Sequence, residues 1–236
     1  MKPYYERGGI TIYHGDCREV LEALPSVDLV VTDPPYVFGI ASTADEGKAG
    51  GWGDLMNSAQ FYAVLLREFK RLLGNKSGAA WVFNSWRSFP VLARAAYEAQ
   101  WGIESLMVWD KCWIGPGGLR GLRPSYEVIA LFATPGFAIG NRGIPDITRF
   151  PWDPSKRHWE HSAEKPSKLC EMLIKESGDA QLILDPFMGS GTTLRAAKDL
   201  GRRAIGIEIE ERYCEIAARR LEQEVLALDF DEKVSA

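Results

Sequence analysis

Four residues with clear chemical potential stand where a predicted strand ends. The apolar run VVT is followed directly by Asp33, Pro34, Pro35 and Tyr36. The Asp33 carboxylate accepts hydrogen bonds, the two prolines stiffen the turn and carry no competing donor, and Tyr36 offers a flat aromatic face. Taken alone, the tetrapeptide is more often an ordinary turn with its aromatic ring on the core, so its meaning depends on the rest of the chain.

A glycine-rich turn follows a second apolar run in LILDPFMGSGTTLRAA, residues 182–197. Its glycines let the backbone approach a ligand, and free amides at the start of the next helix favour a negative group. No lysine stands where a Walker phosphate loop needs one, and Leu194 replaces the third glycine of the dinucleotide fingerprint. About twenty residues later Glu208 ends the next predicted strand, where a carboxylate can accept both hydroxyls of a ribose. A tight turn followed by a capping acid would look similar.

Two weaker motifs accompany these. HSAEKP, residues 161–166, precedes a predicted helix, and by itself is an ordinary helix start with Lys165 in solvent. In IYHGDCREVL a strand ends at Gly15 and Asp16. Asp16 either caps the following helix, which is the commoner role, or accepts a hydrogen bond from an adenine amino group.

Composition indicates one soluble globular domain. The chain has 236 residues, of which 46% are hydrophobic and 25% charged. Its four cysteines form no CxxC pair or Cys/His cluster, which argues against a disulfide framework and against a metal site. No signal peptide or membrane-spanning run is evident, so we expect a cytoplasmic protein with no membrane role.

The charge is unevenly distributed. The formal net charge is -4, yet basic residues outnumber acidic ones between Lys111 and Lys168. Local asymmetry decides where a phosphate backbone can dock. The candidate DNA-binding residues are Arg120, Arg123, Arg149, Lys156 and Arg157.

Short β-branched runs alternate with amphipathic segments, which predicts an α/β fold with a doubly wound, mostly parallel sheet. The predicted strands are Ile10–Tyr13, Leu29–Thr32, Ala79–Phe83, Ile103–Val108, Val128–Phe132, Gln181–Leu184 and Ala204–Ile207. The predicted helices are Cys17–Ala23, Ser58–Leu73, Ser88–Gln100, Ser167–Glu176, Thr192–Leu200 and Glu211–Leu226. We assign Trp81 and Trp109 to the core.

Two stretches break the alternation. Residues 37–57, rich in glycine and small side chains, are predicted to form a long functional loop. Residues 112–164 accumulate glycine, proline, arginine and tryptophan around one clear strand, which predicts an irregular insertion beside the sheet.

DPPY at 33–36, HSAEKP at 161–166 and DPFMGSGT at 185–192 together resemble the DNA amino-methyltransferases that use S-adenosylmethionine. The order of the motifs, with DPPY before the cofactor turn, is similar to that of the circularly permuted β group, which includes adenine methyltransferases. Ser162 and Ala163 depart from that pattern, since the family often has Pro-Thr there. The resemblance covers residues 10 to about 221. It implies a Rossmann-like class I methyltransferase fold, with one catalytic domain over 1–236 and a target-recognition insertion over 112–164.

The resemblance also implies roles for individual residues. The Asp33 side chain and the Pro34 carbonyl would accept hydrogen bonds from the target amine, Pro35 would stiffen the turn, and Tyr36 would stack on a flipped-out base. Lys165 would lie near the cofactor carboxylate, and Glu208 would hold the ribose. The full set of implied cofactor-binding residues is Asp16, Cys17, Asp33, Lys165, Asp185, Phe187, Gly189, Ser190, Gly191, Thr192 and Glu208.

The main interpretation is therefore an adenine-N6 DNA methyltransferase, because an aspartate in the first DPPY position is typical of adenine enzymes in this family. A cytosine-N4 enzyme uses similar chemistry and stays an alternative. A nicotinamide-dependent oxidoreductase would leave DPPY unexplained, and a silent DNA-binding subunit would be expected to lose Asp33 or the glycine turn. DNA is the expected partner and a homodimer is expected from the resemblance, while a partner restriction nuclease is left open.

Overall fold

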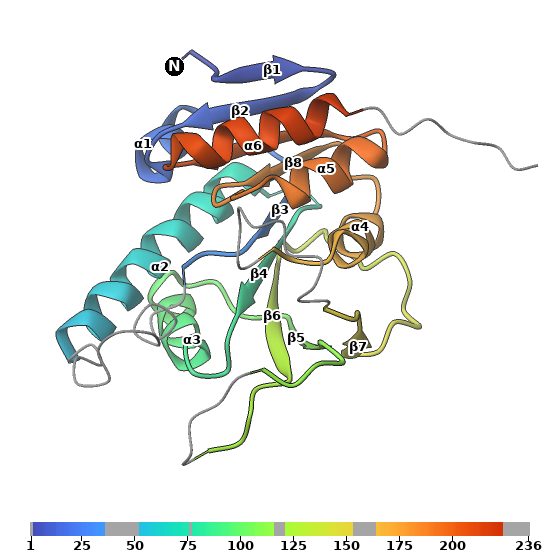
Figure 1. Cartoon of the computed structure of the whole chain (residues 1–236). Coiled ribbons are helices and arrows are strands. Elements are labelled where there is room, and N and C mark those ends of the chain that lie inside the picture. Colours follow the sequence, from blue (N-terminus) through green and yellow to red (C-terminus); the bar gives the residue numbers. More distant parts are fainter. Residues whose placement is uncertain (1, 36–51, 76, 116–120, 153–163, 224–236) are drawn as a thin grey trace, which may run out of the picture.

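The strands of the computed structural model form one nine-stranded sheet. The structure describes residues 2–35, 52–75, 77–115, 121–152 and 164–223 (Figure 1). The strands are β1 Tyr5–Arg7, β2 Ile10–His14, β3 Leu29–Thr32, β4 Ala79–Asn84, β5 Ser105–Asp110, β6 Tyr126–Ala133, β7 Ile147–Arg149, β8 Leu182–Asp185 and β9 Arg203–Glu208. The helices are α1 Cys17–Ala23, α2 Trp52–Leu73, α3 Phe89–Glu98, α4 Ser167–Glu176, α5 Thr192–Asp199 and α6 Glu211–Glu222.

The sheet is mostly parallel, as predicted. Its order is β1-β2-β9-β8-β3-β4-β6-β5-β7, and the five strands from β2 to β4 in that order run parallel. β6 is antiparallel to both β4 and β5, and β1 is antiparallel to β2. β8 and β3 are neighbours although they are far apart in sequence, so the chain leaves them in opposite directions and creates a topological switch point.

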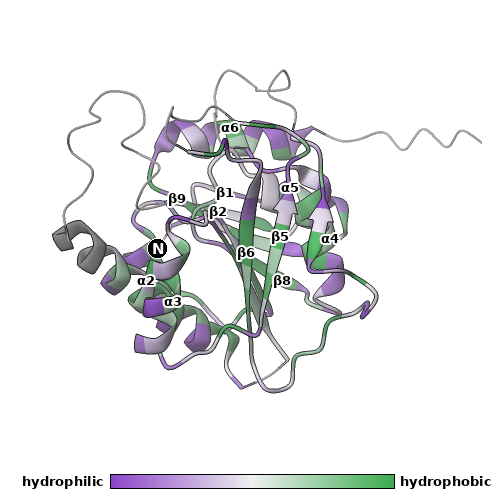
Figure 2. Ribbon diagram, turned by 90° about the horizontal axis from the view of Figure 1, so that it is seen from below, coloured by the Kyte–Doolittle hydropathy of each residue, from purple (hydrophilic) through white to green (hydrophobic). Residues whose placement is uncertain are grey.

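Helices cover both faces of the sheet. α1, α2 and α3 contribute to one buried cluster, and α4, α5 and α6 contribute to the other. Successive side chains of a strand point to opposite faces: in β3, Val30 belongs to the first cluster and Val31 to the second, and in β4, Val82 belongs to the first and Trp81 to the second. Figure 2 shows the sheet between these two groups of helices, with hydrophilic colour on their outer surfaces.

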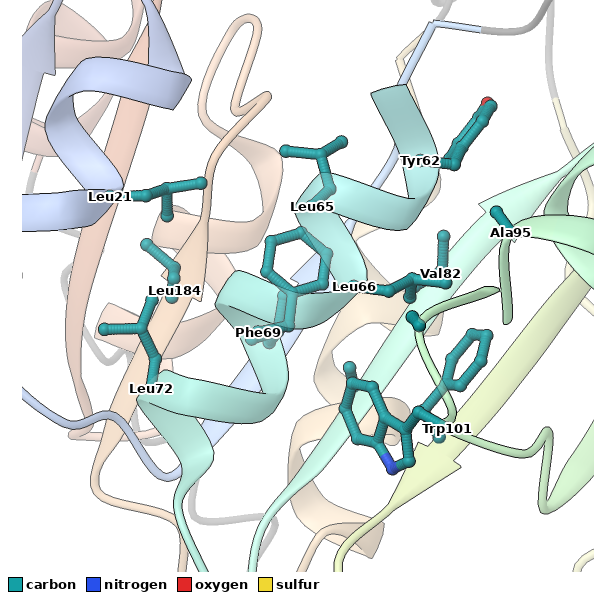
Figure 3. Close-up of a cluster of buried hydrophobic side chains, with 14 of the residues drawn as sticks. Leu21, Tyr62, Leu65, Leu66, Phe69, Leu72, Val82, Ala95, Trp101 and Leu184 are labelled. Carbon is teal, nitrogen blue, oxygen red and sulfur yellow. The ribbon is translucent and has the colours of Figure 1, made fainter. Parts of the chain in front are cut away.

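α2 illustrates why an amphipathic helix forms here. Tyr62, Leu65, Leu66 and Phe69 follow the spacing of one helical face, and each is at most 2% exposed. Figure 3 shows this face directed at the sheet, toward Val82 and Leu184, both of which are buried. Burial of these large side chains fixes α2 over the end of β3, from which the DPPY segment emerges.

Every predicted strand and helix is present, within about two residues at most ends. Trp81 and Trp109 are buried, at 2% and 1% exposed, as predicted. Two three-residue edge strands, β1 and β7, escaped prediction because so short a run carries no alternating pattern. The predicted end of α6 at Leu226 lies outside the described residues.

Two predictions were wrong in part. α2 begins at Trp52, not Ser58, so the last six residues of the predicted loop 37–57 are helical. Gly53 lowers helix propensity there, and the long amphipathic segment that follows outweighs it. Residues 112–164 lie only partly beside the sheet, because their strands β6 and β7 belong to it: β6 lies between β4 and β5, and β7 pairs with β5 at the edge.

No helix among the described residues is long and apolar enough to cross a membrane. Within the same ranges, no group of three or more His, Cys, Asp or Glu side chains could hold a metal ion.

Candidate active site

The carboxyl ends of β3 and β8 meet at the switch point, where doubly wound sheets bind their ligands. A cavity of about 580 Å³ opens there, which is the size of a site for a nucleoside-containing molecule. Most sequence-predicted site residues line it: Asp33, Pro34, Pro35, Lys165, Asp185, Phe187, Gly189, Ser190, Thr192 and Glu208. Residues separated by up to 175 positions in the chain are thus brought together by the parallel strands.

Asp33 follows β3 directly and has one engaged and one unengaged oxygen. Its Oδ2 forms an ion pair with the Nζ atom of Lys165. Its Oδ1 is buried and has no hydrogen-bond partner in the described part of the chain. A buried acceptor without a donor is costly, so this atom fits a ligand that brings an N–H group.

The turn after Asp33 is held from below by α2. The Tyr62 hydroxyl donates a hydrogen bond to the Pro35 carbonyl at 2.9 Å. Burial of the hydroxyl raises the pKa of Tyr62, and the negative charge of Asp33 nearby raises it further. Tyr36, the predicted stacking residue, lies outside the described residues.

Asp185 ends β8 and organises the glycine-rich turn. Its Oδ1 accepts hydrogen bonds from the Thr32 hydroxyl at 2.9 Å and from the Phe187 amide at 3.1 Å. The side chain is 4% exposed, and burial raises its pKa to about 7 despite these donors. The carboxyl group therefore links β3 to β8 under the cavity floor.

Glu208, at the end of β9, is fixed by two backbone amides. Its Oε2 accepts from Gly189 at 3.0 Å and its Oε1 from Glu210 at 2.9 Å. Gly191 has a φ of +82° at the start of α5, and an added Cβ there would stand 2.8 Å from the Cβ of Ala217. The close approach that this glycine permits is to α6, and Gly191 is not among the residues that line the cavity.

Asp16 and Cys17 do not line the cavity either. Asp16 caps α1 through the Arg18 amide at 2.9 Å and also pairs with the Arg18 side chain. Burial raises the pKa of the Cys17 thiol to about 11. The cap is the commoner of the two roles that the sequence allowed for Asp16, and contact of either residue with an adenine ring stays a prediction.

Several site residues escaped sequence reasoning. The cavity is also lined by Phe83, Trp109, Lys111, Glu127, Trp152 and Glu164. Glu127 begins an apolar strand, a place where an acid is typical of an exposed strand end, so no signal in the sequence marks it. Glu164 lies within HSAEKP and accepts from the Thr192 hydroxyl at 3.2 Å while pairing with Arg220. It therefore joins this motif to the start of α5.

Lys165 lies between two carboxylates of the protein. Its Nζ atom pairs with Asp33 and lies 3.4 Å from Glu127 Oε2. A contact with the cofactor carboxylate stays a prediction.

The candidate DNA-binding residues are only partly described. Arg149 extends from β7, is 79% exposed and pairs with Asp110 at 3.1 Å. Arg123 donates to the carbonyls of Gly115 and Ile114, so it also stabilises its own loop. Arg120, Lys156 and Arg157 lie outside the described residues.

A larger cavity of about 820 Å³ lies near the opposite edge of the sheet, at the start of β5 and the end of β6. It is lined by none of the motif residues. The smaller cavity is therefore the candidate site, because two carboxylates held by amides or hydroxyls, a glycine-rich turn and an acceptor without a partner among the described residues converge there.

Comparison with known proteins gives a consistent result. The family model described as DNA methylase matches residues 27–219. The DNA adenine methyltransferase YhdJ of Escherichia coli is 29% identical, over 90% of this chain and 82% of that protein. The crystal structure of the M1.HpyAVI–SAM complex has a TM-score of 0.67 at 26% identity, covering 91% of this chain and 100% of that one. The cytosine-N4-specific PvuII methyltransferase shares the fold, with a TM-score of 0.76 at 19% identity over 96% of this chain and 91% of that one.

Proposed function

The chain belongs to the DNA methylase family, and from that premise we propose that it methylates the N6 amine of an adenine flipped out of DNA. Enzymes of this family take the methyl group from S-adenosylmethionine, which supplies it on a sulfonium sulfur. The observation that carries the proposal is the carboxylate of Asp33 at the cavity, whose buried Oδ1 has no hydrogen-bond partner among the described residues and which stands beside two prolines that stiffen the turn.

The residues of the site suit the cofactor. Glu208 is held in place by the Gly189 and Glu210 amides, so its carboxylate is oriented for a pair of ribose hydroxyls. Phe187, Ser190 and Thr192 lie along the turn that would enclose the remainder of the cofactor. A cavity of about 580 Å³ has room for the nucleoside of the cofactor and for part of the target base.

The amine needs activation because its lone pair is delocalised into the base. Asp33 Oδ1 and the Pro34 carbonyl would each accept one amino hydrogen, which favours a pyramidal nitrogen. The same two acceptors stabilise the positive charge that develops on nitrogen as the methyl group arrives. Because both groups are fixed before the reaction, little reorganisation is needed during it.

Adenine is preferred over cytosine on two grounds. Asp33 occupies the first position of DPPY, where the family's adenine enzymes typically have aspartate. A relative that is matched over 82% of its own length, YhdJ, is described as a DNA adenine methyltransferase. The fold itself does not discriminate, since a cytosine-N4 enzyme shares it.

The test is to identify the product. DNA from a methylation-free host expressing the wild-type chain is digested to nucleosides and analysed by mass spectrometry, with Asp33→Ala as the inactive control. N6-methyladenine in the wild-type sample alone is expected. N4-methylcytosine as the sole product would overturn the choice of base, and no methylated base in DNA that contains all short sequence contexts would overturn the activity.

The proposal extends to the surroundings of the site. Residues 112–164 of a single catalytic domain would read the target sequence, because they border the cavity through Trp152 and carry the exposed Arg149. We also expect a cytoplasmic protein that forms a homodimer. Light scattering after gel filtration, with and without DNA, measures the oligomeric state.

A further inference from the structure

Four charged side chains of alternating sign lead away from the catalytic aspartate. Lys165 pairs with Asp33 on one side, and its Nζ atom lies 3.4 Å from Glu127 Oε2 on the other. Glu127 in turn pairs through Oε1 with the Nζ atom of Lys111 at 2.5 Å. These residues come from four separate segments: the end of β3, the start of α4, the start of β6 and the end of β5. We call Asp33, Lys165, Glu127 and Lys111 the charge network.

The charge network is mostly enclosed. The side chains of Lys165, Glu127 and Lys111 are 10%, 14% and 19% exposed, and that of Asp33 is 26% exposed. Aromatic rings cover both ammonium groups: Phe83 lies 5.4 Å from Lys165 Nζ, and Trp109 and Trp152 lie 5.3 and 6.0 Å from Lys111 Nζ. Charges this far from water interact strongly, so each member alters the behaviour of the next.

Stability alone does not account for such a network. Replacing a buried ion pair by apolar side chains of similar volume is often neutral or stabilising, because desolvation offsets the attraction between the charges. The network does, however, lie against the cavity, and three of its members line the wall near Asp33. Its position points to the reaction.

We propose that Glu127 is a positioning residue for methyl transfer, acting on Asp33 through Lys165. Lys165 holds Asp33 Oδ2, which leaves Oδ1 as the free acceptor for the amine. Glu127 draws part of the ammonium charge away from Asp33, and Lys111 balances Glu127, so the network is neutral. This inference rests on the proposed function, since it gives Asp33 its partner amine.

The effect of the Glu127 charge on Asp33 has a predictable direction. Removing the Glu127 charge leaves two cations beside one carboxylate, so the ammonium groups attract Asp33 more strongly and weaken it as an acceptor for the amine. Burial alone would lower the pKa of Lys165, but Asp33 and Glu127 outweigh it and hold that pKa above its usual value. Within the described part of the chain, the other titratable groups that interact with Asp33 from the packed elements are Tyr62 on α2, Cys170 on α4 and Asp185 on β8. They remain the same in wild type and variant.

Glu127→Gln tests the proposal, because it removes the charge and keeps the shape. We expect kcat to fall about tenfold to a hundredfold with the KM for S-adenosylmethionine nearly unchanged, as for a small misplacement of a catalytic group. The kcat–pH profile should also differ from that of the wild type, because the charge beside Lys165 has been removed. Glu171→Gln is the matched control: it removes a carboxylate of similar exposure, 12%, which pairs with Lys168 on α4 and does not line the cavity, and it should leave both quantities unchanged.

A second variant separates charge balance from folding. Adding Lys111→Met to Glu127→Gln restores neutrality, so the pH profile should return toward that of the wild type and kcat should partly recover. The proposal is overturned if Glu127→Gln keeps the wild-type kcat and pH profile, or if the double variant is less active than the single one and melts at a lower temperature. A wild-type protein that methylates no DNA would instead overturn the proposed function, and the two failures are therefore distinguishable.

Discussion

The parallel part of the sheet and its antiparallel edge build the site in different ways. In the parallel part, β3, β8 and β9 each end in a carboxylate at the cavity or next to it: Asp33, Asp185 and Glu208. At the edge, β6 runs in the opposite direction, so Glu127 at its beginning reaches the same cavity as Lys111, which follows the end of β5. The direction of a single strand thus decides which residues join the site.

The two parts also differ in what they supply. The parallel part provides acceptors and a backbone turn, and two of its carboxylates, Asp185 and Glu208, are held by amides or hydroxyls. The edge provides counter-charges and aromatic walls, with Lys111 between Trp109 and Trp152. We infer that the first part performs the chemistry and that the second tunes it. Substitutions in the two parts should therefore differ in size and in kind.

The largest effect is expected at Asp33. Asp33→Ala removes a carboxylate that lines the cavity and the buried oxygen proposed as acceptor, and methyl transfer should fall by about a thousandfold, as when one preorganised charge-stabilising group is lost. Calorimetry should show S-adenosylmethionine affinity within a few-fold of wild type, because Phe187, Ser190 and Glu208 remain. Asp33→Asn is the matched control for size and should be nearly as inactive. Substantial activity in either variant contradicts the assigned chemistry.

A smaller effect is expected from the buried acid of the parallel part. Asp185 has a pKa raised to about 7, so between about pH 4 and pH 7 the folded chain holds a proton that the unfolded chain has lost. Its contribution therefore favours folding at low pH and is lost as the pH rises through 7. The free energy of unfolding should drop across this range by on the order of 3 kcal/mol more in wild type than in Asp185→Asn. Urea unfolding of both proteins at several pH values measures the difference, and parallel curves would show that Asp185 does not titrate there.

The same contrast explains what the sequence could and could not predict. Asp33, Asp185 and Glu208 are readable because strand, acid and turn are contiguous in the chain, and parallel strands place their ends at one edge. Glu127 and Lys111 carry no local signal: they meet only because β6 is antiparallel and pairs between β4 and β5. The start of α2 was missed for a related reason, since tertiary packing of Phe69 and its neighbours extends the helix through residues of low propensity.

A still smaller effect is expected from the glycine turn. At Gly191 an alanine would adopt a φ of +82° and meet Ala217 at 2.8 Å, so it combines backbone strain with a clash against α6. Gly191→Ala should lower the free energy of unfolding by roughly 2 kcal/mol and weaken cofactor binding, because the start of α5 must move. Gly201→Ala is the control: its φ is +67° and nothing lies within 4 Å, so strain acts without a clash. An equal loss of unfolding free energy in both variants would show that α6 can move away from the added methyl group at no cost.

The smallest effect belongs to the edge strand β7. Arg149 is 79% exposed and its ion pair with Asp110 is screened by water, so Arg149→Ala should leave the melting temperature nearly unchanged. If its side chain contacts a DNA phosphate, the slope of log affinity against log salt should become shallower by about one, without a change in sequence preference. Arg94→Ala is the matched control, because Arg94 pairs with Glu98 on the surface of α3 and is 62% exposed. A shift in target sequence would instead assign Arg149 to a base, and an unaltered slope would move DNA contact away from β7.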